Sequence, residues 1–512
     1  MTFSFRQFNL HITTILQDKV RVEYKKADIK IMKRIFFIIV VPIIMVASLS
    51  GQSGKKYSKE KEAAIQLIEL MQDELTKISD TIWNYAEIGL EEYKSSKLLA
   101  DFAEKNGFKV ERGISGMPTA FIASYGTGKP VIGITGEYDA LPGLSQKAVS
   151  KKEAIIEGGP GHGCGHNLIG TGALGTAIAI KTLIEDGSIK GTIRYYGTPA
   201  EDNYGGKLYM ARDGYFDELD ICLNWHPGDL TKTYFRDSYA LFDYSIRFHG
   251  RTAHASGNPW DGRSSLDAVE SFVHGINLLR EHIKPTVRMH YVITKGGDIP
   301  NVVPDNTEVW LWTRDFDMNN LFELDERIKD IAKGASMIAG VEQEIILNNG
   351  LYNILPNKKG SELLQSNLEL LEPVSFSKDE YEFACQIQEE SKLKKAGIRS
   401  QPLTMDEAMI DPWELTSDIG DVSWTVPTIT LLSVCVPKDV PMHSWGSTSC
   451  FGSSIGHKGM IYASKALALT MIDLYKNPVQ LIAIKKEFAE RKGAIVYKTM
   501  LPPGPPLIPE RR

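Results

Sequence analysis

A glycine-rich stretch at residues 158–172 carries side chains that bind metal ions in proteins. It reads GGPGHGCGHNLIGTG, with Cys164 and His166 two positions apart. Thiolate and imidazole suit zinc and other first-row divalent ions, and glycine lets the backbone fold closely around a small object. In extended backbone, residues two apart point to the same side, so we expect Cys164 and His166 to face one centre. The alternative is a glycine turn with an incidental buried cysteine.

Polar side chains also follow three predicted strands, at 131–136, 192–196 and 220–225. The polar residues beyond these strands are Asp139, Glu201, Asp202 and His226. Strands that alternate with helices predict a largely parallel sheet, whose site lies beyond the carboxyl ends of its strands. Taken singly, Asp139 also fits a turn, and His226 fits a buried histidine with satisfied hydrogen bonds. Glu201 and Asp202 fit a solvated cap. Their succession at strand ends favours convergence on Cys164 and His166 in a metal site.

The composition is ordinary for a soluble globular protein and does not indicate a nucleic-acid-binding one. The chain has 512 residues, enough for more than one domain. Its net charge of −6 shows no basic surplus, so we expect no nucleic-acid partner. The five cysteines are scattered and odd in number, which does not indicate a disulfide framework.

The N-terminus predicts export. Met32, Lys33 and Arg34 precede the apolar run IFFIIVVPIIMVASL, and small residues follow it. This order is typical of a secretory signal peptide over about 32–51, which predicts a secreted or periplasmic protein. The run is shorter than the about twenty residues of a membrane span, and an uncleaved anchor is the alternative. Residues 1–31 would be an upstream extension, which leaves Met1 and Met32 as competing start codons.

The order of predicted elements indicates an α/β protein with an insertion. After residues 1–51, a catalytic domain with a mixed, largely parallel sheet is expected at 52–238 and again at 351–480. Residues 239–350 read strand, helix, strand, strand, helix, strand, which is the ferredoxin-like α+β order. We interpret this segment as an inserted lid or dimerisation domain. Residues 481–512 form a proline-rich C-terminal tail.

The insertion and the segment after it hold further polar candidates. His254 lies in GRTAHAS, Asn301 in IPNVVPD, and Arg314 ends a strand in which Trp310 and Trp312 share its face. A turn histidine and a surface ion pair are the plainer interpretations of His254 and Arg314. In the second part of the catalytic domain, a buried-type strand leads to PMHSWGS, which contains His443.

These stretches together resemble the M20-type metallopeptidase and amidohydrolase superfamily. The segments EYDALPG, GPGHGCGHN, GTPAED, NWHPGD, PNVVPD and HKGM match in order, and the resemblance extends from about residue 55 to 507. It implies two divalent metal ions, zinc or manganese, with Cys164 bridging them. The metal ligands that it implies are Cys164, His166, Asp202, His226 and His443. The family usually has Glu at position 202, so the shorter Asp202 leaves its ligand role and the metal spacing open.

The resemblance also assigns roles in catalysis and substrate binding. It implies Glu201 as the general base, His254 as a stabiliser of the oxyanion and Asp139 as a support for the metal ligands. Asn301 and Arg314 would hold the carboxylate of the substrate, and a guanidinium suits such bidentate capture.

The implied reaction is hydrolysis of the amide bond of an N-acyl or N-aroyl amino acid, most simply one like p-aminobenzoyl-glutamate. A homodimer is expected, or a hetero-oligomer with a paralogous A subunit. Alternatives on the same fold are a secreted metallo-dipeptidase and an N-acyl amino acid deacylase. Other classes are a metal-holding protein without activity and a membrane-tethered interaction protein. The sequence does not specify the acyl group, the amino acid, the native metal or the need for a partner.

Overall fold

The computed structural model describes residues 57–236, 238–410, 416–501 and 503–506. The predicted upstream extension, the signal peptide and the last residues of the tail lie outside the described residues. Within them, one helix is long and apolar enough to cross a membrane, His166–Glu185, and 89% of its apolar window is buried inside the protein. That burial is typical of a core helix.

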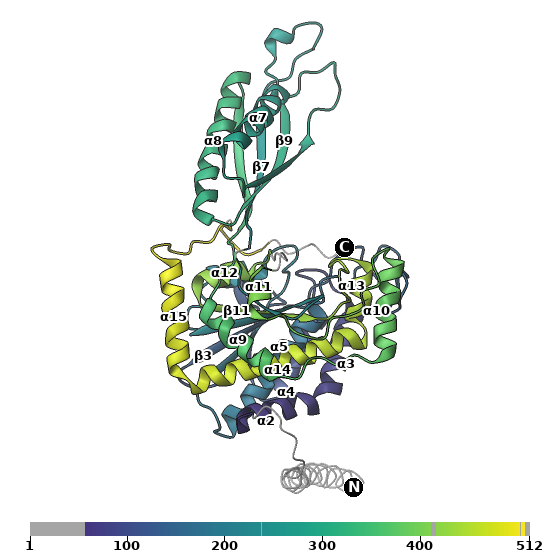
Figure 1. The fold of residues 1–512 in the computed structure, drawn as a ribbon. Coiled ribbons are helices and arrows are strands. Elements are labelled where there is room, and N and C mark those ends of the chain that lie inside the picture. The colour runs from purple at the N-terminus through teal and green to yellow at the C-terminus, as the bar shows by residue number, and fades with distance from the viewer. Residues whose placement is uncertain (1–56, 237, 411–415, 502, 507–512) are drawn as a thin grey trace, which may run out of the picture. The chain divides into compact units, whose positions relative to one another are not determined.

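A seven-stranded sheet forms the centre of the catalytic domain, in the order β1-β2-β4-β3-β5-β11-β6 (Figure 1). Its four central strands, β4, β3, β5 and β11, are parallel, and the remaining pairings are antiparallel. The predicted mixed sheet with a parallel centre is thereby confirmed. The strands are β1 (Lys109–Arg112), β2 (Phe121–Gly126), β3 (Val131–Gly136), β4 (Thr192–Gly197), β5 (Ile221–Gly228), β6 (Lys232–Tyr234) and β11 (Thr428–Val434).

Helices pack on this sheet around the long buried helices α5 and α14. Helix α5 is rich in small residues because its neighbours approach closely: a Cβ at Gly175 would lie 2.7 Å from Leu75. The helices of this domain are α2 (Lys59–Leu70), α3 (Gln72–Tyr85), α4 (Tyr93–Lys105), α5 (His166–Glu185), α6 (Gly206–Arg212), α9 (Lys358–Leu370), α10 (Lys378–Glu390), α11 (Met405–Ile410), α12 (Ile419–Thr425), α13 (Trp445–Phe451), α14 (Ser454–Lys476) and α15 (Pro478–Lys492).

A second sheet, of four antiparallel strands, lies in the chain between β6 and α9. Its order, β10-β7-β9-β8, is the ferredoxin-like arrangement predicted for the insertion. Helices α7 and α8 cover one face and bury an apolar core against it (Figure 1). The domain boundaries themselves stay predictions. The elements are β7 (Ala240–His249), α7 (Ser265–Leu279), β8 (Arg288–Lys295), β9 (Asn306–Asp315), α8 (Met318–Ala339) and β10 (Glu342–Leu351).

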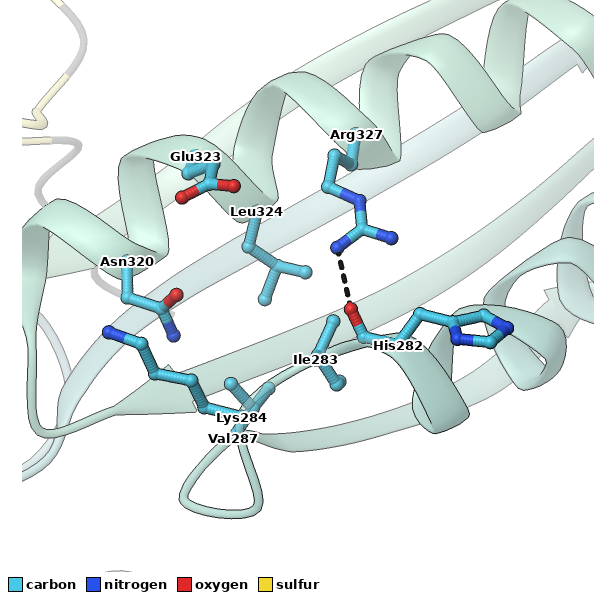
Figure 2. Close-up of a pocket in the computed structure, with 8 residues that line it drawn as sticks. All are labelled: His282, Ile283, Lys284, Val287, Asn320, Glu323, Leu324 and Arg327. Carbon is cyan, nitrogen blue, oxygen red and sulfur yellow. Dashed lines mark hydrogen bonds between the residues drawn. The ribbon is translucent and has the colours of Figure 1, made fainter.

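A hollow of about 380 Å³ lies between α8 and the turn before β8 (Figure 2). Arg327 on its wall donates a hydrogen bond to the carbonyl oxygen of His282, at 2.9 Å. The wall mixes positive and negative side chains, and no residue singled out by the motifs lines it. Its lining residues are His282, Ile283, Lys284, Val287, Asn320, Glu323, Leu324 and Arg327.

Candidate metal centre

A thiol and two imidazoles meet beyond the carboxyl ends of the parallel strands. The Sγ atom of Cys164 lies 3.2 Å from Nε2 of His226 and 3.2 Å from Nε2 of His443. Cys164 precedes α5, His226 lies near the carboxyl end of β5, and His443 follows β11. Three segments far apart in sequence thus deliver donor atoms to one point, as the sheet topology predicts.

His166 is held in the orientation typical of a metal-binding histidine. Its Nδ1 lies 2.7 Å from Oδ1 of Asp139, and that carboxylate also accepts the backbone N–H of Asp202 at 3.1 Å. The other ring nitrogen, Nε2, is buried and has no hydrogen-bond partner in the described part of the chain. A carboxylate that fixes one nitrogen and leaves the second free is the arrangement that accompanies histidine ligands of metal ions.

The local backbone differs from the extended form assumed for Cys164 and His166. Gly165 between them is left-handed, with φ 78° and ψ 26°, and His166 is the first residue of α5. The expectation of extended backbone between Cys164 and His166 is therefore wrong. The two side chains still share a group because the glycine turns the chain sharply into the helix.

Among the described residues, the donor atoms form four groups, each with atoms within 4.8 Å of one another. Two groups share Cys164: one adds His166 and His226, the other Asp202 and His443. The other two share His166 and contain the pairs Glu137 with Glu201 and Asp139 with Asp202. All five predicted metal ligands, Glu201 and Asp139 therefore lie in one cluster.

The residues present fit a cation. Three buried polar atoms of this cluster have no hydrogen-bond partner among the residues that the structure describes: Oε2 of Glu137, Nε2 of His166 and Oδ2 of Asp202. An unpartnered buried polar atom costs about 1–3 kcal/mol, and more when charged. Sulfur, nitrogen and oxygen donors together suit a divalent ion of the zinc or manganese type.

Glu137 is a member of the cluster that the motifs did not assign. It lies directly beyond β3, with Oε2 3.4 Å from Nε2 of His166. Its position two residues before Asp139, at the end of the same strand, was the sequence feature that could have placed Glu137 in the cluster. Burial alone would raise the pKa of Glu137, but Lys207 and His166 hold it below its ordinary value.

Lys207 and Asp418 are also additions from the structure. The Nζ atom of Lys207 lies 2.6 Å from Oε1 of Glu137 and 2.5 Å from Oδ1 of Asp418, and both side chains are buried. Asp418 also accepts the backbone N–H of Lys207 at 2.9 Å. The two residues are 211 positions apart, and no local pattern links them. We call Glu137, Lys207 and Asp418 the buried triad.

The remaining histidine of the glycine stretch has a structural role. His162 is buried, and its Nε2 lies 3.0 Å from the carbonyl oxygen of Ile82. Burial lowers the pKa of His162 to about 4. It belongs to none of the four donor groups.

Burial sets the protonation tendencies of the cluster. It raises the pKa of Asp202 to about 7, and burial together with the charge of Glu137 raises the pKa of Glu201 well above its ordinary value. Burial also lowers the pKa of His226 to about 4. For His166, burial alone would lower the pKa, but Asp139, Cys164 and Asp202 together outweigh burial and raise the pKa well above its ordinary value. A divalent cation acts on carboxylates in the opposite sense to burial, so it would favour their ionised forms.

Two residues beside the donor atoms have left-handed backbone although neither is glycine. Ala200 precedes Glu201 with φ 58°, and His443 has φ 56°. The backbone N–H of Ala200 donates to Oε1 of the buried Glu92 at 2.8 Å, which helps to hold this turn. Strained backbone of this kind occurs at sites where geometry is fixed by the surrounding structure.

The three candidates in the insertion lie apart from the cluster in sequence and sheet. Loop segments bring His254 beside Asn301: His254 is bridged to Val302, and the N–H of Ala255 donates to the carbonyl oxygen of Asn301 at 3.1 Å. Arg314 lies on β9. Within the described ranges, no hydrogen bond joins these three side chains to the cluster, so their roles stay predictions.

Comparisons with known proteins define the class. A model of peptidase family M20/M25/M40 matches residues 133–421. The chain belongs to this family, which confirms the resemblance drawn from its motifs, and it is a hydrolase that acts on carbon–nitrogen bonds.

Three proteins of this family or fold are similar to the chain over most of its length. The chain is 36% identical over 464 residues to the B subunit of p-aminobenzoyl-glutamate hydrolase from Escherichia coli K12, covering 85% of this chain and 96% of that protein. It is 27% identical over 441 residues to the mouse Xaa-Arg dipeptidase, covering 84% and 92%. Among solved structures it resembles a dinuclear metal-binding peptidase of the M20 family from Bacillus subtilis, with a TM-score of 0.55, 15% identity and coverage of 80% and 99%. At 15% identity, the similarity to the Bacillus subtilis structure shows a shared fold alone.

Proposed function

We propose that this protein is a metal-dependent amidohydrolase that cleaves N-acyl or N-aroyl amino acids, with compounds like p-aminobenzoyl-glutamate as its main substrates. The observation that carries the proposal is the pair of donor groups that share Cys164, beside three buried atoms without a hydrogen-bond partner in the described part of the chain. The substrate class is supported by the similarity to the Escherichia coli protein, whose name states that substrate.

The donor groups support a site for two divalent ions, zinc or manganese. One ion would be held by His166 and His226, the other by Asp202 and His443, with Cys164 between them, in agreement with the two groups that share its sulfur. Such ions polarise the amide carbonyl and acidify a bound water molecule. Asp139 would fix the orientation of His166 through its hydrogen bond.

Glu201 would act as general base and then as general acid. Its Oε2 lies 3.8 Å from Nε2 of His166, beside the predicted ligands. Burial raises the pKa of Glu201, and neighbouring cations would lower it again, towards the neutral range in which proton exchange is most effective. The carboxylate would accept a proton from the attacking water and deliver it to the leaving amine.

His254 has the hydrogen-bonding pattern of a neutral N–H donor. Its Nδ1 lies 3.1 Å from the backbone nitrogen of Gly257 and 3.3 Å from that of Ser256. A backbone N–H only donates, so Nδ1 accepts and Nε2 carries the hydrogen. That exposed N–H suits stabilisation of an oxyanion. Asn301 and Arg314 would hold the substrate carboxylate, and closure of the inserted domain would complete the site.

The cellular setting that we propose comes from the sequence alone. A signal peptide at about 32–51 would export the protein to the periplasm or beyond, and N-terminal sequencing of the mature protein tests this. We also propose a homodimer, or a hetero-oligomer with a paralogous A subunit. Sedimentation of the purified chain alone and with such a subunit distinguishes the two.

A metallo-dipeptidase is the second candidate. The observation that favours it is the similarity to the mouse Xaa-Arg dipeptidase over most of both chains. Because all cluster residues serve either reaction, only substrate preference separates the two. A panel that pairs p-aminobenzoyl-glutamate with dipeptides ending in arginine makes the distinction.

The test uses purified protein stripped of metal and then supplied with manganese or zinc. We expect metal-dependent release of glutamate from p-aminobenzoyl-glutamate, with about two ions bound per chain. Two bound ions with cleavage of dipeptides alone would favour the second candidate. Protein that binds no metal would refute the assignment of the cluster.

A further inference from the structure

The face of the inserted sheet that α7 and α8 do not cover carries a hollow of about 220 Å³. It lies on the adjacent strands β8 and β9, where Trp312 is paired with His290 and Trp310 with Val292. Val309 and Leu311, which alternate with the tryptophans, are buried against the helices on the other face. We call this feature the tryptophan hollow. Its lining residues are His290, Tyr291, Val292, Trp310, Trp312 and Arg314.

Two hydrogen-bond donors in the tryptophan hollow lack acceptors. Nε1 of Trp312 and Nε of Arg314 are buried and have no partner among the residues that the structure describes. Nε1 of Trp310, by contrast, donates to Oδ1 of Asp243 at 2.8 Å. Buried donors are normally satisfied, so the two unpaired donors indicate a ligand that brings acceptor atoms.

Among the side chains that line the hollow, Arg314 carries the positive charge, and the neighbouring carboxylate of Asp243 already accepts hydrogen bonds from Trp310 and Asn348. The guanidinium of Arg314 lies 5.0 Å from the centre of the Trp312 ring, and Arg288 is its partner in the pairing of β8 with β9. No carboxylate is among the lining residues. An anion therefore suits this wall, and a guanidinium binds a carboxylate through two parallel hydrogen bonds.

The wall beside Arg314 is aromatic and open. Trp310 is 43% exposed and Val292 59% exposed, which is unusual for such large apolar side chains on one patch. A cavity of about 150 Å³ is enough to hold benzene, and this hollow is larger. A flat ring that covers Trp310 and Trp312 would also gain from aromatic packing.

We propose that the tryptophan hollow binds an aromatic carboxylate, with its ring on the two tryptophans and its carboxylate on Arg314. An N-aroyl amino acid carries both groups: its aroyl ring would lie on the two tryptophans, and its amino-acid carboxylate would be held by Arg314, the residue proposed above for that carboxylate. The inference rests on the proposed function for its biological role, and it makes Trp310 and Trp312 determinants of the preference for aroyl compounds.

The test is calorimetric titration of the full-length, metal-free protein with benzoate, acetate and benzylamine. We expect benzoate to bind at least about tenfold more tightly than the other two, a difference of about 1.4 kcal/mol. Trp310→Ala and Arg314→Gln should each weaken benzoate binding about tenfold or more, while Trp310→Phe should retain it. Trp260→Phe is the matched control, because Trp260 is 73% exposed and does not line the hollow.

Several results would overturn the proposal. Among them are equal affinity for acetate and benzoate, or benzoate binding that survives Trp310→Ala. Absence of benzoate binding together with a change of oligomeric state in Trp310→Ala would show that another copy of the chain covers the hollow.

Hydrolysis of N-benzoyl-glutamate and N-acetyl-glutamate by the metal-loaded protein is measured separately. Trp310-dependent benzoate binding without hydrolysis of either amide would refute the proposed function and leave the hollow assigned. Hydrolysis of both amides with no effect of Trp310→Ala on benzoate binding or on their ratio would refute the hollow alone.

Discussion

Replacing Lys207 by methionine tests whether the buried triad has the charges that its geometry implies. Its ammonium lies 2.6 Å from Glu137 and 2.5 Å from Asp418, with no exposed side-chain surface. Methionine keeps much of the volume and removes the charge, which leaves two buried carboxylates without their shared cation. Breaking a buried ion pair by removing one partner costs about 3–5 kcal/mol.

This loss of about 3–5 kcal/mol in the free energy of unfolding lowers the melting temperature. For domains of 150–250 residues, each kcal/mol corresponds to about 2–4 °C, so we expect a fall of about 6–20 °C for metal-free Lys207→Met. Differential scanning calorimetry of the metal-free protein measures it. Metal-free protein is the right sample, because a bound cation would itself compensate Glu137.

Lys329 provides the matched control. Its Nζ lies 2.7 Å from Asp325 and 2.9 Å from Glu326, so it also contacts two carboxylates, but its side chain is 45% exposed. Solvent screens such pairs to at most about 1 kcal/mol, and Lys329→Met should change the melting temperature by only about 2–4 °C.

Equal shifts in Lys207→Met and Lys329→Met would refute the argument, since burial is the main difference between them. Removing the whole charge set, in the triple variant Lys207→Met, Glu137→Gln and Asp418→Asn, should recover part of the lost stability. A triple variant less stable than Lys207→Met would show that packing, rather than charge, explains the loss.

Three further predictions concern the cluster and its surroundings. Glu201→Gln should retain its metal and lose about 10²–10⁴-fold in kcat; near wild-type turnover with full metal content by atomic absorption would remove Glu201 as the base. Asp202→Glu restores the usual family residue and should keep both ions and activity within about tenfold, whereas Asp202→Ala should lose an ion; equal metal content in both variants would exclude Asp202 as a ligand. Burial, and then the charge of Asp139, raises the pKa of Glu92 to about 8. The folded state therefore binds more protons than the unfolded state between pH of about 4.5 and 8, and the free energy of unfolding falls as pH rises through that window. Glu92→Gln should flatten this fall in denaturant titrations; an unchanged slope would show that Glu92 is ionised in the folded protein.

Local patterns in the sequence were sufficient for the main elements and for most members of the cluster. The runs at 131–136, 192–196 and 220–225 became β3, β4 and β5, and the order of the insertion became a four-stranded ferredoxin-like sheet. Because parallel strands present their carboxyl ends at one edge of a sheet, the sequence alone predicted that Asp139, Glu201 and His226 lie together. The period of apolar residues and the type of each side chain are local properties of the sequence, so they can be recognised without the fold.

Tertiary structure alone decided the contacts between distant segments. The salt bridge of Lys207 with Asp418 spans 211 residues, and nothing in either local stretch marks it, because its stability depends on exclusion of water that only packing provides. The left-handed turn at Gly165, found in place of the expected extended backbone, follows from α5 beginning at His166. Within the described residues, the donors of Trp312 and Arg314 that lack acceptors are likewise a property of the assembled sheet face, since a lone strand leaves every such group in water. The sequence determined which groups are present and at which end of the sheet they gather; the fold determined which are buried, which are paired and which are left to bind a ligand.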